Sequence, residues 1–178
     1  MKQHEKTLSE KLIHKGRVIT VYQEEVLLPN GKVSTRDIVR HKGACAILAT
    51  VEDKIIMIKQ YRKALDKVIY EIPAGGIEEG EDIALCAKRE LNEETGYEAE
   101  NLQYLAGMVT SPGFCDEVIH VYLAENVKKV IEKAPCDEDE FIEVYLIQQS
   151  HVEEMIRSGE IIDAKTICAY SMYKAMRS

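Results

Sequence analysis

The sequence predicts an α/β or α+β fold in which one mixed sheet is combined with a few helices. Three observations support this prediction. Short apolar runs typical of strands recur along the chain, a strongly marked helix lies near its middle, and two shorter helical patterns lie near its end. There is no regular alternation of strand and helix, and neither a G-x-x-x-x-G-K-[ST] nor a G-x-G-x-x-G phosphate loop occurs. A doubly wound nucleotide-binding fold is therefore not expected.

Several segments have the composition of strands. They are Arg17 to Leu28, Lys32 to Arg40, Ala44 to Val51, Lys54 to Lys59, Val68 to Ile72, Leu102 to Val109, Val118 to Ala124 and Phe141 to Ile147. Asn30-Gly31 separates the first two, and Asn-Gly between strand-like runs is the strongest short signal for a hairpin. The polar residues before them, Met1 to Lys15, are expected to be mobile or to lie on a partner.

Three helices are expected. The stretch from about Asp82 to Thr95 is helical in pattern, and a glycine follows it, as is common where a helix ends. Ser150 to Glu153 has the pattern of a capping box, so we expect a short helix from there to Gly159. Asp163 can cap a last helix that runs to Met176. The apolar face of that helix would comprise Ala169, Met172, Tyr173 and Met176.

The composition is that of a soluble globular protein. Of 178 residues, 46% are hydrophobic, and 31 acidic residues exceed 23 basic ones, which gives a net charge of −8. No apolar run approaches the ~18 residues of a membrane helix, and general nucleic-acid binding needs a basic face that this chain lacks. No cysteines have C-x-x-C spacing, and Met1 to Lys15 lacks the apolar region of a secretory signal. We therefore expect a cytoplasmic protein without a membrane or nucleic-acid partner.

The residues with the clearest chemical meaning lie on the central helix. At about 100° per residue, Glu93 and Glu94 fall about −60° and +40° from Glu90, so three carboxylates share one arc. Arg89 stands four residues before Glu93 and can neutralise one acid. The repulsion left between Glu90 and Glu94 favours a divalent cation such as Mg²⁺ or Mn²⁺, which prefers carboxylate oxygens. The apolar residues beside the arc, which would face the core, are Ala84, Ala87 and Leu91.

The alternative, a solvated glutamate-rich surface, is disfavoured by the wider pattern. The segment from Gly75 to Tyr97 fits G-x5-E-x7-R-E-U-x-E-E-x-G-U, where U is a bulky apolar residue and Tyr97 is a loose match. A chance match would occur roughly once in a million chains of this size. In this segment the chain resembles the Nudix hydrolases. The resemblance implies an α/β/α sandwich around a mixed sheet, with a loop–helix–loop that binds divalent metal and cleaves a nucleoside diphosphate linked to another group.

The resemblance also implies roles for individual residues. Glu90 and Glu94 would be the chief metal ligands, together with the main-chain carbonyl of Ala74. Glu93 would be a further ligand or would orient metal-bound water, and Arg89 would hold the glutamates in place. The implied cofactor is Mg²⁺ or Mn²⁺, as two or three ions. Such ions neutralise a diphosphate and lower the pKa of bound water.

Motifs outside this segment resemble the ADP-ribose pyrophosphatase subgroup. They are Gln60-Tyr61-Arg62, Glu71 to Gly75, Ser111-Pro112-Gly113-Phe114, Asp137-Glu138-Asp139-Glu140 and Gly159 to Thr166. By this resemblance Arg62 and Pro112 would contact substrate, and Glu117 would assist at the metal or the substrate. Glu138 or Glu140, with Glu138 preferred, would help to activate the attacking water. Each motif also has a plain structural interpretation, as a turn, a solvated acidic loop or a surface ion pair.

The sequence therefore predicts a Mg²⁺-dependent hydrolase that cleaves ADP-ribose to AMP and ribose 5-phosphate. GDP-mannose or another nucleotide sugar stays open as the substrate, because relatives with such activities share nearly all of these motifs. An ADP-ribose sensor without catalysis and a broad pyrophosphatase are further alternatives. The subgroup resemblance also implies a homodimer. Residues 1–40 would form an antiparallel β region that contacts the second subunit, and residues 41–178 would form the catalytic domain.

Overall fold

The computed structural model describes residues 3–135 and 140–177. The chain forms two compact units. The first consists of Met1–Gly43 together with Val109–Val118, and the second consists of Ala44–Met108 together with Ile119–Ser178. The first unit is therefore assembled from two stretches that are far apart in the sequence.

The first unit is built on a three-stranded antiparallel sheet in the order β1-β2-β3. Its strands are β1 (Lys6–Lys15), β2 (Ile19–Leu27) and β3 (Val33–His41). The predicted hairpin between the last two is confirmed, and Gly31 in its turn has a φ of 80°, which favours glycine. Strand β1 was not predicted. All ten of its residues are exposed, so it has no alternating apolar face that the sequence could reveal.

The segment Val109–Val118 joins this unit through main-chain and side-chain bonds to β3. The backbone N–H of Val39 donates to the carbonyl of Phe114 over 2.7 Å. The carboxylate of Asp116 accepts from the backbone N–H of His41 at 2.8 Å and pairs with Arg40 at 3.3 Å. The end of β3 thus depends on a segment about 75 residues further along the chain.

The second unit is built on a seven-stranded mixed sheet with the central order β12-β5-β4-β10-β9. Strands β4 and β10 are parallel, whereas β5 is antiparallel to both β4 and β12. Two short strands extend the sheet, since β6 pairs with β5 and β7 pairs with β4. The strands are β4 (Ala44–Val51), β5 (Lys54–Arg62), β6 (Lys67–Glu71), β7 (Ala74–Gly76), β9 (Gln103–Val109), β10 (Val118–Ala124) and β12 (Glu143–Gln148). A separate two-stranded sheet pairs β8 (Tyr97–Glu98) with β11 (Lys128–Lys129).

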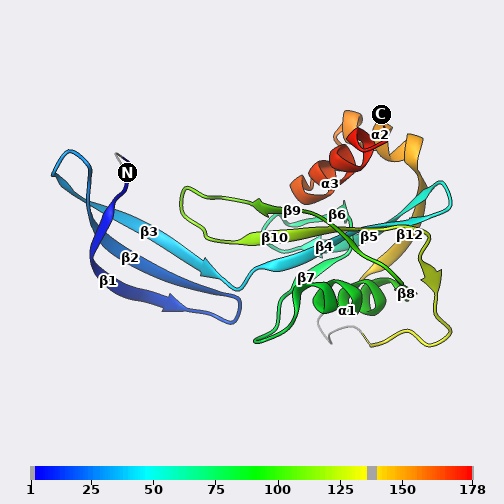
Figure 1. The fold of residues 1–178 in the computed structure, drawn as a ribbon, viewed down its shortest axis with the longest axis horizontal. Coiled ribbons are helices and arrows are strands. Elements are labelled where there is room, and N and C mark those ends of the chain that lie inside the picture. The colour runs from blue at the N-terminus through cyan, green and yellow to red at the C-terminus, as the bar shows by residue number, and fades with distance from the viewer. Residues whose placement is uncertain (1–2, 136–139, 178) are drawn as a thin grey trace. The chain divides into compact units, whose positions relative to one another are not determined.

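Helices cover both faces of the mixed sheet, with α1 (Ile83–Thr95) on one face and α2 (Gln149–Ser158) and α3 (Ala164–Ala175) on the other (Figure 1). Successive residues of β4 point to opposite faces. Ile47 packs with Leu91 of α1, whereas Leu48 packs with Met155 of α2 and Tyr173 of α3. The predicted α/β/α sandwich with a mixed sheet is therefore confirmed. In the described ranges, no helix is both long enough and apolar enough to cross a membrane.

The helix ends differ from the predictions in two places. The capping box at Ser150 is wrong, because the N-cap of α2 is Gln148, two residues earlier, and Gln148 makes no side-chain capping bond. Met176 lies outside the apolar face of α3, because the helix ends at Ala175 and the Met176 side chain is 51% exposed. The predicted caps at Asp82 and Asp163 are both confirmed, since each carboxylate accepts a bond from a backbone N–H of the first turn.

Candidate active site

Helix α1 carries two buried acids on its sheet-facing side. Glu94 is 1% exposed and Glu90 is 7% exposed. Both lie beside Leu91, which is fully buried against the sheet, as the helical spacing predicted. Glu93 lies at the rim of this face, with 28% of its side chain exposed. Burial of charged carboxyl groups is costly unless they are paired or bind a cation. We therefore look for a positive partner of Glu90 and Glu94.

Arg89 connects the acids of this segment. Its Nη1 donates to Oε1 of Glu90 at 2.7 Å and to Oε2 of Glu93 at 2.9 Å. Its Nε and Nη2 donate to the two oxygens of Glu81 at 2.8 and 3.0 Å. Arg89 therefore lowers the pKa of Glu81 to about 2, and a bond from the backbone N–H of Glu78 acts in the same direction. The contact with Glu93 was predicted from the four-residue spacing, whereas the Glu81 contact was not.

The carboxyl group of Glu90 is difficult to ionise. Burial raises its pKa to about 7, and the negative charges of Glu93 and Glu140 act in the same direction. Arg89 opposes this shift without cancelling it. Near neutral pH the protonated and ionised forms of Glu90 therefore coexist, and a cation that binds the carboxylate would favour the ionised form.

Glu94 is affected more strongly. Burial raises its pKa to about 8, and the charges of Glu90 and Glu140 add to the effect. A hydrogen bond from the backbone N–H of Ala74 at 2.8 Å and the positive charge of Arg62 act in the opposite direction. Two neighbouring buried carboxyl groups with raised pKa values are typical of a functional site.

The glycine-containing loop before α1 makes room for these carboxyl groups. Strand β7 pairs with β4, which fixes Ala74 and Gly75 against the sheet. A Cβ atom on Gly75 would lie 2.0 Å from Cδ of Glu90 and 2.2 Å from each of its oxygens. Only glycine therefore leaves the Glu90 carboxylate in this place.

These residues fit a hard divalent cation in their chemistry. Such ions take carboxylate and main-chain carbonyl oxygens, which Glu90, Glu94 and Ala74 can supply. Among the described residues, no group of three or more His, Cys, Asp or Glu side chains is already arranged around one point. Glu90 and Glu93 instead share Nη1 of Arg89. Because the pKa values of Glu90 and Glu94 are raised, binding of a metal ion would release protons from this buried pair.

The two loop glutamates differ in what the structure describes. Glu138 lies in residues 136–139, outside the described part of the chain. Glu140 is described and half-buried, and its charge raises the pKa values of both Glu90 and Glu94. Glu140 is thus brought into the neighbourhood of the two buried acids.

Pro112 and Glu117 lie in the first unit. The backbone N–H groups of Phe114 and Cys115 both donate to the carbonyl of Ser111, so Pro112 sits in a tight turn. The carboxylate of Glu117 accepts from Oγ1 of Thr110 at 2.8 Å. The expected contacts of Pro112 and Glu117 with substrate stay predictions.

The sequence did not predict two hydrogen bonds at the C-terminal end of α1. Nζ of Lys133 donates to the main-chain carbonyl of Glu94 at 3.1 Å, and Oδ1 of Asn92 accepts from the backbone N–H of Ala134 at 3.0 Å. These bonds anchor the segment that leads toward the acidic loop. Asn92 occupies an unspecified position of the predicted pattern, so no sequence signal pointed to it.

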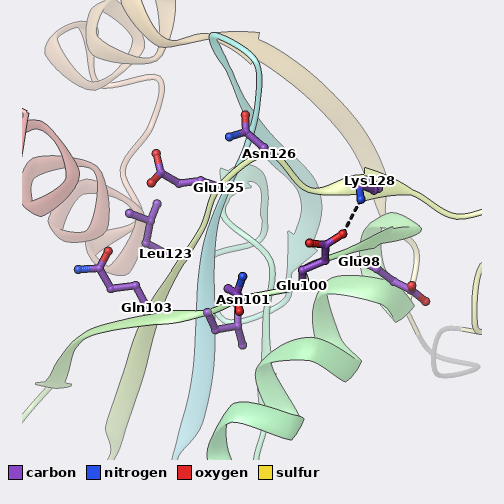
Figure 2. A pocket seen from close by; sticks show the side chains of 9 residues that line it. Glu98, Glu100, Asn101, Gln103, Leu123, Glu125, Asn126 and Lys128 are labelled. Atoms are coloured by element: carbon purple, nitrogen blue, oxygen red, sulfur yellow. Dashed lines mark hydrogen bonds and ion pairs between the residues drawn. The ribbon is translucent and has the colours of Figure 1, made fainter.

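Figure 2 shows a pocket of about 430 Å³ whose lining includes none of the glutamates of α1. Its lining residues are Glu98, Glu100, Asn101, Leu102, Gln103, Leu123, Glu125, Asn126 and Lys128. Lys128, its one described cationic residue, already pairs with Glu100. The lining is therefore mainly acidic and polar, and it includes no residue of the segment from Gly75 to Tyr97.

Comparison with known proteins agrees with the fold. The family described as the NUDIX domain matches residues 39–169, and the nucleoside diphosphate sugar hydrolase N-terminal domain matches residues 5–39. The chain therefore belongs to the NUDIX family.

Individual relatives extend over nearly the whole chain. The ADP-ribose pyrophosphatase of Bacillus subtilis (strain 168) is 51% identical over 166 residues, which cover 93% of this chain and 90% of the relative. The methanol dehydrogenase activator of Bacillus methanolicus is 48% identical with the same coverage. A solved structure of an ADP compounds hydrolase superposes with a TM-score of 0.87 and covers 98% of this chain and 94% of its own. At 21% identity, that structure supports the fold alone.

Proposed function

We propose that this protein is a divalent-metal-dependent hydrolase that cleaves the diphosphate of ADP-ribose to AMP and ribose 5-phosphate. The observation that carries the proposal is the buried pair Glu90 and Glu94 on α1 of a NUDIX protein. The relative named ADP-ribose pyrophosphatase supports ADP-ribose as the substrate. The name of the other relative, methanol dehydrogenase activator, describes an effect on another enzyme and does not name a substrate.

The side chains around α1 have distinct proposed roles. Bound Mg²⁺ or Mn²⁺, as two or three ions, would neutralise the diphosphate and lower the pKa of the attacking water. Glu90, Glu94 and the carbonyl of Ala74 would hold the metal. Arg89 keeps Glu90 and Glu93 in place through its shared Nη1, and Glu93 would orient water at the rim. The buried position of the pair suits such a site, because electrostatic interactions are stronger where water is excluded.

Glu138 and Glu140 both stay candidates for the group that accepts the proton of the attacking water. The effect of Glu140 on the pKa values of Glu90 and Glu94 supports Glu140. A general base must come within about 3 Å of its water. A loop glutamate can approach two buried acids closely only when positive charge is present to offset the repulsion.

We also propose a homodimer formed through the N-terminal β region, residues 1–40. Large apolar side chains of β1 are exposed, namely Leu8 at 47%, Leu12 at 52% and Ile13 at 52%. A sheet that exposes apolar side chains and an edge strand favours association with a second copy. A cytoplasmic location is part of the proposal, because the described cysteines are free thiols, which suits a reducing compartment.

A product assay tests the function. Purified protein with Mg²⁺ is offered ADP-ribose, GDP-mannose, ADP-glucose and FAD in parallel, with Glu94→Gln as the blank. AMP released mainly from ADP-ribose is the expected result. GMP released from GDP-mannose, with ADP-ribose nearly untouched, would overturn the substrate and keep the chemistry. Tight binding of ADP-ribose without any product would favour the sensor.

A further inference from the structure

A buried cluster of charged side chains lies beside Arg62. Glu71, the last residue of β6, is 1% exposed, and its two oxygens accept from Nε and Nη2 of Arg62 at 2.6 and 2.7 Å. This is the fork geometry in which an arginine binds a carboxylate most firmly. Nζ of Lys165 donates to Oε2 of the same carboxylate and lies 3.1 Å from Oδ1 of Asp163. Two acids and two bases thus balance one another in charge.

The beginning of α3 holds Lys165 in this cluster. Oδ2 of Asp163 accepts from the backbone N–H of Thr166 at 3.0 Å and from its Oγ1 at 2.6 Å. Oγ1 of Thr166 accepts in turn from the backbone N–H of Ile72 at 2.9 Å. Thr166 is fully buried and Lys165 is 8% exposed. The helix cap therefore ties the start of α3, and with it Lys165, to Ile72 in the short link between β6 and β7.

Arg62 differs from Glu71 and Lys165 because it reaches solvent. Its side chain is 39% exposed, against 9% for that of Lys165. Within the described residues its hydrogen bonds use Nε and Nη2, which leaves Nη1 for an anionic oxygen. Arg62 also lies near the buried pair of α1, because its partner Glu71 stands three residues before Ala74, whose backbone N–H donates to Glu94 at 2.8 Å. The positive charge of Arg62 accordingly opposes the rise in the pKa of Glu94.

We propose that Lys165 and Glu71 are positioning residues that hold the guanidinium of Arg62 in one orientation, with Nη1 presented to a phosphate oxygen of the substrate. The inference rests on the proposed function, because it requires a phosphate-bearing substrate at the site. Neither residue touches that substrate. Glu71 fixes the plane of the guanidinium, and Lys165 fixes Glu71. The side chain of Arg62 therefore loses its conformational entropy when the protein folds, and substrate binding does not have to order it.

A double-mutant cycle tests this chain of contacts. Lys165→Met should lower kcat/KM for ADP-ribose about tenfold, as is common for residues that orient a binding group. In the Arg62→Ala background the same substitution should have no further effect, because Lys165 acts through Arg62. Lys165→Arg should restore most of the activity. An equal loss in both backgrounds would show that Lys165 contributes only to the fold and would overturn the proposal.

Lys174→Met is the matched control. Lys174 lies on the same helix, is half-exposed and pairs with Glu153 at 3.6 Å, outside the cluster. We expect this variant to keep wild-type kcat/KM. Thermal unfolding of each variant shows whether it is folded, and Lys165→Gln replaces Lys165→Met if the latter does not fold.

Nitrogen-15 NMR of the arginine side chains tests the positioning without substrate. The Nε–H of Arg62, assigned by its disappearance in Arg62→Ala, should exchange slowly with water in the wild type. It should exchange much faster in Lys165→Met and in Glu71→Gln. Unchanged exchange in both variants would overturn the proposal. If the wild type cleaves no ADP-ribose, the proposed function fails, and the NMR result still decides whether Lys165 and Glu71 hold Arg62.

Discussion

Replacement of Gly75 by alanine should disable the site while leaving the fold intact. The added Cβ would lie 2.0 Å from Cδ of Glu90, whereas an ordinary contact begins at 3.4 Å. To reach an ordinary contact the carboxylate must therefore move by about 1.4 Å, the difference between these two distances. Metal ligands are held within about 0.2 Å of their ideal distances, so Glu90 would be lost as a ligand in its present place.

The displaced atoms are the end of a flexible side chain, which limits the effect on stability. We expect the free energy of unfolding to change by no more than about 1–2 kcal/mol. Activity should fall about a hundredfold or more, because displacements of about 1 Å in a catalytic arrangement have effects of that size. The loss should appear in kcat/KM and as a higher Mg²⁺ concentration at half-maximal rate.

Gly76→Ala provides the matched control. A Cβ on Gly76 would meet no atom within 4 Å, so this variant should keep wild-type activity. Both variants are assayed for AMP release over a Mg²⁺ titration, with urea unfolding in parallel. If Gly75→Ala matched the wild type in rate and Mg²⁺ dependence, the placement of the Glu90 carboxylate would have no part in metal binding.

Three other perturbations address the same site. Glu94→Gln should lower turnover by orders of magnitude with the fold retained, because it removes a proposed ligand; wild-type turnover would exclude Glu94 from the metal site. In the metal-free protein, the pKa values of about 7 for Glu90 and about 8 for Glu94 lie above the ordinary 4.5, so the folded state keeps protons that the unfolded chain releases. The free energy of unfolding should therefore fall as the pH rises from about 5 to about 8, and Mg²⁺ should raise it more at about pH 8 than at about pH 6. Urea titrations with and without Mg²⁺ measure this, and the opposite slope would contradict the assignment. Glu140→Gln should lower kcat more than it raises KM; normal kcat in this variant with a loss in Glu138→Gln would give the loop role to Glu138.

The sequence predicted those elements whose patterns have a local physical cause. The apolar run of β4 and the cap at Asp82 depend on residues close together in the chain, and both were predicted. Strand β1 was missed because its residues are all exposed and its order comes from pairing with β2. The cap of α2 was misplaced because a pattern that fits a capping box does not exclude an N-cap two residues earlier.

In the site, too, contacts within one helix were predicted and contacts between distant segments were missed. Helical spacing placed the glutamates of α1 on one face and Arg89 within reach of Glu93. It could not indicate Lys165, which reaches Glu71 across 94 residues of sequence. Pairings between distant segments depend on how the sheet and α3 pack. No sequence pattern relates the position of Lys165 to that of Glu71. The degree of burial of Glu94, which raises its pKa, is likewise a property of the packed unit.

The discontinuous make-up of the first unit affects how this protein can be recombined with its relatives. The two family matches meet at residue 39, which lies inside β3 and donates its N–H to Phe114. A chimera joined at that residue would place a foreign strand against a native Ser111–Asp116 turn. The N-terminal sheet and this turn are therefore expected to be inherited together, as one module encoded in two separate stretches of the gene.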